Sequence, residues 1–214
     1  MSQVEGENTI KDGLVIIDSN ENEYVWIEVP RTADVYITAG TDIVNFTDSD
    51  YEKIENDLHT YTHLYRNGTN YNDIYYSDET TGLSEIDYNS LKKKMLKSIY
   101  QKAGFWISRY EIGVQEQRTG HSDISNLIPL SQKGIYPLTD VYCNEAEEIA
   151  RKYNIEGYSS SIMFGVQWDL ILVYLEKNAE WNTSESDTVQ KYLREDSTSW
   201  GNYYNSSFTL NNGK

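Results

Sequence analysis

The segment that decides the fold is Gly165-Val-Gln-Trp-Asp-Leu-Ile-Leu-Val-Tyr-Leu-Glu-Lys177. On a helix its apolar side chains wrap almost the whole circumference instead of forming one stripe. A helix of this kind is expected at the centre of a domain, packed against a sheet and against other helices. We therefore expect Trp168 to be buried, and its truncation to alanine to destabilise the protein by about 3 to 5 kcal/mol.

Strands are predicted from shorter apolar runs on either side of this helix. Residues 14–17 and 24–29 are joined by polar residues and predict a hairpin that ends at Pro30. The alternating run 105–112 predicts a further strand that Gly113 ends.

Helices are predicted where capping residues precede apolar side chains at helical spacing. Ser84-Glu-Ile-Asp87 resembles a capping box and begins a helix that ends at Gly104. The mixture of elements predicts an α+β fold with antiparallel strands and several packed helices. Further helices are predicted at about 48–58, 144–153 and 187–194, and a loop, functional or disordered, is predicted at 67–82.

The length of 214 residues suits one domain. We expect a flexible N-terminus over residues 1–13 and a single domain over 14–214, with a helical and loop insertion at about 48–103.

The net charge of −16 repels nucleic acid and anionic lipid, so neither is an expected partner. No apolar run reaches the roughly 18 to 20 residues that cross a bilayer. No secretory signal is visible before Lys11, so the expected location is cytoplasmic or virion-associated, unless the chain is exported within a larger protein.

Four motifs follow one another in an informative order. They are Tyr24-Val-Trp-Ile-Glu-Val-Pro30, Phe105-Trp-Ile-Ser-Arg-Tyr-Glu111, Pro137-Leu-Thr-Asp-Val141 before a helix with Ala146, and Gln167-Trp168-Asp169. In this order they resemble motifs of the formylglycine-generating enzyme (sulfatase-modifying factor) family, whose fold is an elaborated C-type-lectin-like one. The resemblance covers roughly residues 20–30 and 104–204, so it implies a fold of that type for this chain.

The sequence departs from the family where the chemistry is concerned. Family members that oxidise a cysteine use two reactive cysteines and bound copper, together with Gly-Asn-Val-Trp-Glu-Trp and Arg-Gly-Gly-Ser segments. None of these segments is present, and the single Cys143 does not match a catalytic position. We expect either an incomplete domain, which would self-associate or pair with a partner chain that completes the fold, or a shorter variant that closes its core differently.

Two other groups of side chains could in principle support chemistry. His59 and His63 have the i, i+4 spacing of two metal ligands, but no third ligand lies near them in sequence. Cys143 lies at the start of a predicted helix, where a thiol can be activated, although a small half-buried residue is the favoured interpretation. We therefore expect no catalytic residue, no metal and no cofactor.

The lysines of the helix that follows Ser84 allow two interpretations. Lys92, Lys93, Lys94 and Lys97 could form a patch for an anion or an acidic partner. The favoured alternative is a solvated helix face whose positive charge suits the helix C-terminus.

The 19 Tyr, 5 Trp and 18 Asn of the chain allow two interpretations, a recognition surface or a compositional drift without function. The predicted ligand-binding residues are Trp200, Asn202, Tyr203 and Tyr204, because rigid rings beside amides are typical of adaptable binding surfaces. An ordinary strand and turn with inward rings is the alternative. We expect a non-catalytic recognition or structural domain. The family resemblance implies a protein or glycan ligand, because relatives of such domains occur as bacterial surface and phage-borne display proteins. The second hypothesis is a metal-dependent oxidase of the formylglycine-generating type, completed by missing sequence or another chain, and the third is a plain structural subunit.

Overall fold

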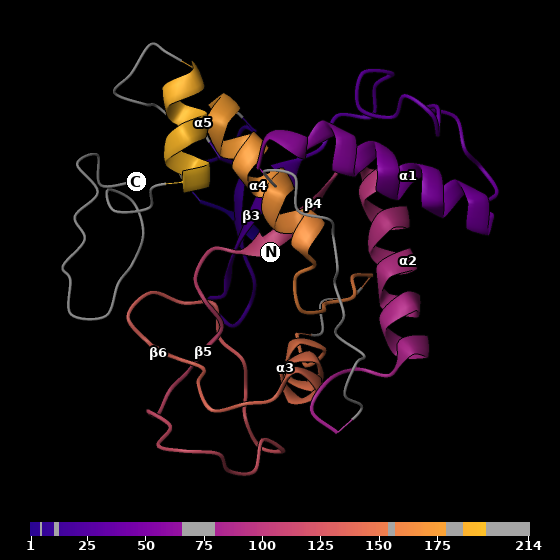
Figure 1. Ribbon diagram of the computed structural model, residues 1–214. Coiled ribbons are helices and arrows are strands. Elements are labelled where there is room, and N and C mark those ends of the chain that lie inside the picture. Colours follow the sequence, from indigo (N-terminus) through magenta and orange to yellow (C-terminus); the bar gives the residue numbers. More distant parts are fainter. Residues whose placement is uncertain (5, 11–12, 66–79, 154–156, 179–185, 196–214) are drawn as a thin grey trace.

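A computed structural model describes residues 1–4, 6–10, 13–65, 80–153, 157–178 and 186–195 (Figure 1). The fold combines α-helices with antiparallel sheets, which confirms the predicted α+β class. No helix in these ranges is both long and apolar enough to span a bilayer.

The main sheet has four antiparallel strands in the order β1-β2-β3-β4. The predicted hairpin is confirmed as β2 and β3, and the strand predicted after position 104 is β4, which pairs with β3. The predicted flexible segment 1–13 includes β1, whose residues pair with β2. The strand bounds are Ser2–Gln3 for β1, Val15–Ile17 for β2, Glu23–Glu28 for β3 and Gly104–Ser108 for β4.

Four helices accompany this sheet close to the predicted positions, and a short 3-10 helix that the sequence did not predict follows the first of them. Ser84 caps α2 as predicted, because its hydroxyl accepts a hydrogen bond from the backbone N–H of Asp87. The helix ends at Ala103, which takes the left-handed conformation expected of Gly104. The bounds are Asp48–Tyr61 for α1, His63–Tyr65 for the 3-10 helix η1, Glu85–Lys102 for α2, Gly165–Asn178 for α4 and Ser186–Glu195 for α5.

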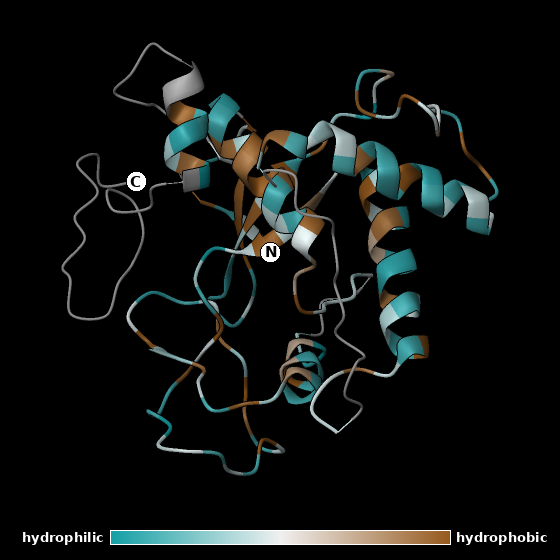
Figure 2. Ribbon diagram, viewed as in Figure 1, coloured by the Kyte–Doolittle hydropathy of each residue, from teal (hydrophilic) through white to brown (hydrophobic). Residues whose placement is uncertain are grey.

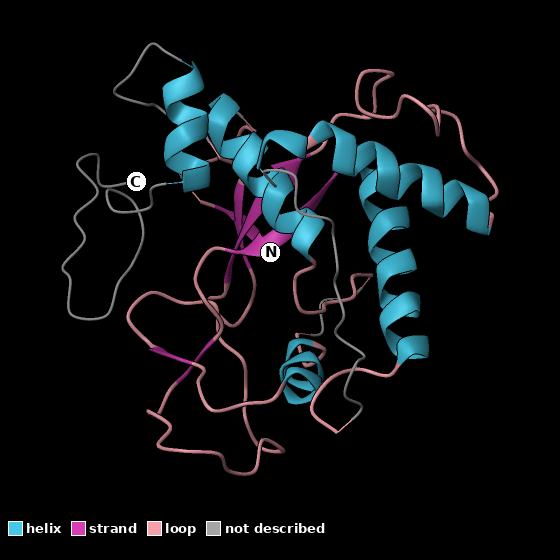
Figure 3. Cartoon of the chain, in the orientation of Figure 1, coloured by secondary structure: helices cyan, strands magenta, loops and turns pink. Residues whose placement is uncertain are grey.

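The main core lies between the sheet and the helices α1, α2 and α4. Figure 3 shows α4 crossing in front of the sheet, and α4 contacts β3 while α2 contacts β4. Ile27 and Phe105 lie opposite each other on the strands and share one buried cluster with Ile99 of α2 and Leu170 of α4. Brown, hydrophobic stretches alternate with paler and teal ones on the strands in Figure 2. We call the side of the sheet that α2 and α4 cover, on which Ile27 and Phe105 lie, the core face.

The helix α4 is central, as predicted, but Trp168 is not buried. Leu170 is 2% exposed, whereas Trp168 is 43% exposed, so the prediction of a buried tryptophan was wrong. The cause is the position of α5, which covers α4 one turn further on, at Leu172 and Val173. The first turn of α4 therefore keeps one side open to solvent, and the tryptophan lies on it.

The chain between β4 and α4 forms a second, smaller layer. It holds a two-stranded sheet of β5 (Gly113–Val114) and β6 (Tyr136–Pro137), followed by α3 (Cys143–Ala150), and lies at the bottom of Figure 1. Glu147 of α3 is 1% exposed and accepts hydrogen bonds from Arg151 and from the backbone N–H of Ile162. This carboxylate therefore fastens the segment before α4 to α3.

Candidate functional site

The candidate site is the side of the main sheet opposite the core face. Trp26 of β3 lies directly across from Trp106 of β4, with ring centroids 5.0 Å apart and an interplanar angle of 62°. Side chains two residues apart point to the same side of a strand, so Leu14 and Ile16 lie on this side too. All four side chains are half-buried, and none belongs to the buried clusters found among the described residues. We call these four residues the aromatic face.

Gly104 makes room for the indole of Trp26. A Cβ atom at position 104 would lie 2.5 Å from this indole and 2.4 Å from the carbonyl oxygen of Ile27. The backbone at Gly104 also has a φ of +154°, which side chains rarely adopt. Trp26 therefore lies over a backbone position that only glycine can occupy, and its ring is held by the sheet itself.

A polar margin follows the tryptophan pair along the strands. Tyr24 and Ser108 lie opposite each other, one pleat further along the same side. The ring of Tyr153 meets that of Tyr24 edge-on at 6.0 Å. The Tyr153 hydroxyl lies beside Ser108 but makes no well-formed hydrogen bond within the described residues. Burial raises the pKa of both Tyr24 and Tyr153, so both hydroxyls stay protonated, and that of Tyr24 donates to the carboxylate of Asp18.

The predicted lysine row joins the helices α1 and α2. Lys92 lies 3.1 Å from the Glu55 carboxylate, and Lys93 lies 2.7 Å from that of Asp48. Lys97 lies 5.2 Å from the ring centroid of Phe46. These three ammonium groups face partners within the chain, which favours the predicted helix face over an anion patch.

Cys143 shows no sign of an activated thiol. It is half-buried at the edge of the main core, as the favoured interpretation predicted. Burial raises the pKa of its thiol, and the nearby carboxylate of Glu147 raises it further. A nucleophilic cysteine needs the opposite shift.

The predicted histidine pair does not converge on a metal site. Nδ1 of His63 donates to the carbonyl oxygen of Thr60 at 2.7 Å, so this ring caps the end of α1. Within the described ranges, no three His, Cys, Asp or Glu side chains are grouped so that they could hold a metal ion. The predicted ligand-binding residues Trp200, Asn202, Tyr203 and Tyr204 lie outside the described residues.

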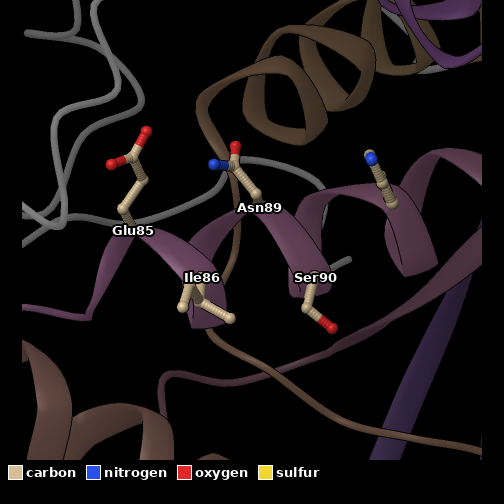
Figure 4. A pocket seen from close by; sticks show the side chains of 5 residues that line it. Glu85, Ile86, Asn89 and Ser90 are labelled. Carbon is tan, nitrogen blue, oxygen red and sulfur yellow. The ribbon is translucent and has the colours of Figure 1, made fainter. Parts of the chain in front are cut away.

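A shallow hollow on the outer side of α2 is a weaker candidate. It is lined by Glu85, Ile86, Asn89, Ser90 and Lys93, and Ile86 is 82% exposed. Figure 4 shows Glu85 and Asn89 pointing to one side of the helix while Ile86 and Ser90 point to the other. The polar groups do not converge on one point, so this hollow has no arrangement that would orient a ligand.

Sequence reasoning treated Trp26 and Trp106 as strand residues and did not identify the aromatic face. The alternation of both strands was visible, but their pairing joins residues far apart in the chain.

Comparisons with protein-family models, curated proteins and solved structures give no match.

Proposed function

We propose that the protein is a non-catalytic recognition domain that binds a protein or glycan ligand through its aromatic face. The single observation that carries the proposal is the Trp26–Trp106 pair, which is half-buried and lies outside the buried clusters of the described residues. Tryptophan offers a large apolar surface at a low cost in conformational entropy, and it is enriched at the centres of binding sites.

The aromatic face suits recognition better than simple core packing. A tryptophan that served only the core would be expected on the side of the sheet that α2 and α4 cover. Val25 and Ile27 occupy that side, while Trp26 between them points away from it. Of these three side chains, the one outside the core cluster is thus the one with the largest contact surface.

We also infer that the fold belongs with the formylglycine-generating enzyme family and its C-type-lectin-like relatives. The proposal is supported by the positions of the matched motifs, because three of the four lie on β3, β4 and α4. These elements adjoin, since β3 pairs with β4 and contacts α4. A crystal structure of the chain tests this inference: a strand order or connection at variance with that family would reject it.

The oxidase alternative has less support. Its chemistry would need a reactive thiol, and the raised pKa of Cys143 works against thiolate formation. A copper titration in the presence of a cysteine-containing peptide provides the test. Stoichiometric copper binding with oxidation of that peptide would replace the recognition proposal with the oxidase.

The recognition proposal is tested by selection with two libraries, a random-peptide phage library and a glycan array. We expect at least one library to give ligands whose binding is lost in Trp106→Ala. The matched control is Trp168→Ala, which removes another solvent-accessible tryptophan from a different surface. If neither library gives a ligand that depends on Trp106, the aromatic face is not a recognition site.

A further inference from the structure

We propose that the ligand of the aromatic face is a neutral glycan, with a sugar ring packed against the Trp26–Trp106 pair and its hydroxyls hydrogen-bonded along the polar margin. This inference rests on the proposed function and names the ligand class for the same site. It follows from the chemistry of the face, its rigidity, its size and the charge around it.

The chemistry of the face matches the two sides of a sugar. A pyranose ring presents C–H groups on its faces and hydroxyl groups around its edge. The tryptophan pair offers apolar rings, and Ser108 adjoins them two residues along β4 from Trp106. Behind Ser108 lies the Tyr153 hydroxyl, 8% exposed as a residue and without a well-formed hydrogen bond among the described residues. The half-buried hydroxyl of Ser108 therefore offers a ligand a hydrogen-bonding group beside the tryptophan pair.

The tryptophan pair is ordered before any ligand arrives. The two indoles contact each other across paired strands, and Trp26 also lies over Gly104. Fewer rotamers are therefore lost on binding, which matters for a weakly held ligand such as a sugar. A rigid apolar surface with a few fixed polar groups is the usual composition of a small-ligand site.

The size of the face favours a glycan over a protein. Leu14, Ile16, Trp26 and Trp106 are each half-buried, so together they expose about a few hundred Å² at most. A stable protein interface needs about 800 Å² from each partner. One or two sugar rings fit the smaller area.

The charge of the chain favours a neutral ligand over an anionic one. The net charge is −16, and several basic groups already face partners within the protein. Arg109 binds two carboxylates, and Lys152 donates to carbonyl oxygens of the loop at 124–127. A sulfated or uronic-acid polymer would meet long-range repulsion that a neutral sugar does not feel.

The test is a glycan array that carries neutral and anionic glycans, followed by calorimetry on the best ligand. We expect neutral glycans to bind, and Trp26→Ala and Trp106→Ala each to weaken binding by about tenfold or more. Ser108→Ala, a smaller change, is expected to weaken binding by a lesser factor. Trp168→Ala should bind like the wild-type protein, and circular dichroism confirms that each variant is folded.

Three outcomes would overturn the glycan inference. The array could give no binding, it could give only anionic glycans, or the affinity for neutral glycans could be unchanged in Trp106→Ala. If peptides from the phage library bind in a Trp106-dependent manner while glycans do not, the recognition proposal stands and the ligand is a protein. If the binding of peptides and the binding of glycans are both independent of Trp106, both proposals fail.

Discussion

The guanidinium group of Arg109, just after β4, holds the carboxylate of Glu7 with two hydrogen bonds of 2.8 Å and so joins residues 102 positions apart. The same group donates to Glu23 of β3, also at 2.8 Å. All three side chains are roughly three-quarters shielded from solvent, so the pairs are screened less than surface ion pairs. The N-terminal segment is thereby fastened to the sheet at a point beyond β1.

Removing the guanidinium group of Arg109 is expected to destabilise the protein. Arg109→Ala leaves two carboxylates close together without their shared cation, so we expect a loss of about 1 to 3 kcal/mol in the free energy of unfolding. Arg109→Lys keeps the charge but not the planar fork, and should lose less. Urea denaturation measures both. Arg118→Ala is the control, because Arg118 is also half-buried, but its hydrogen bonds within the described residues go to carbonyl oxygens instead of carboxylates. An equal loss in that variant would contradict the role given to the Glu7 contact.

Asp57 of α1 is expected to be essential for the loop that precedes the helix. Its carboxylate is 3% exposed and accepts hydrogen bonds from the backbone and hydroxyl of Thr38 and from the backbone of Ala39. Asp57→Asn turns one acceptor into a donor facing other donors, so we expect a loss of about 2 to 4 kcal/mol. Asp48→Asn changes an exposed carboxylate of the same helix and should lose under about 1 kcal/mol. Comparable thermal stabilities of the two variants would count against this reasoning.

The Asp18 carboxyl is expected to make stability depend on acidic pH. Burial opposes its charged form, but hydrogen bonds from Asn22, Asn20 and Tyr24 outweigh burial and hold the pKa of Asp18 below its usual value. Such a group stabilises the fold above its unfolded pKa, about 3.9, and that stability is lost as the pH falls through the folded pKa. Asp18→Asn should therefore be less stable than wild type near neutral pH, and the difference should shrink below about pH 4.

Urea unfolding at a series of pH values from neutral to acidic measures this effect. Asp34→Asn, at an exposed position, serves as the control. A difference between wild type and Asp18→Asn that stays constant across the acidic range would show that the carboxyl charge is not its origin.

The two sides of α4 should respond differently to truncation. Leu170→Ala empties a buried site in the main core and should lose about 2 to 5 kcal/mol. Trp168→Ala removes a side chain that is 43% exposed and should lose about 1 kcal/mol. Chemical denaturation measures the free energy of unfolding of both variants. A larger loss in Trp168→Ala than in Leu170→Ala would indicate that Trp168 is buried, as the sequence predicted.

Gly104 should tolerate no side chain. In Gly104→Ala the new methyl group would collide with the Trp26 indole and the Ile27 carbonyl oxygen, so we expect a loss of about 2 kcal/mol or more. Gly120→Ala is the matched control, since Gly120 also has a positive φ but has open space around it. Differential scanning fluorimetry of both variants gives the comparison, and equal shifts in Tm would mean that the tryptophan contact adds nothing beyond backbone strain.

Local patterns in the sequence predicted several elements of the fold. Two apolar runs joined by polar residues predicted the hairpin, alternation predicted β4, and the Ser84 cap predicted the start of α2. These signals depend on residues a few positions apart. The apolar circumference of 165–177 predicted that α4 would be central.

Only the tertiary structure decided which side chains these elements bring together. Trp26 meets Trp106, and Arg109 meets Glu7, through strand register and segments far apart in the chain. The exposure of Trp168 depends on where α5 ends its cover of α4. Periodicity fixes which way a side chain points on its own element, but burial depends on what packs against that side, and that is a property of the whole fold.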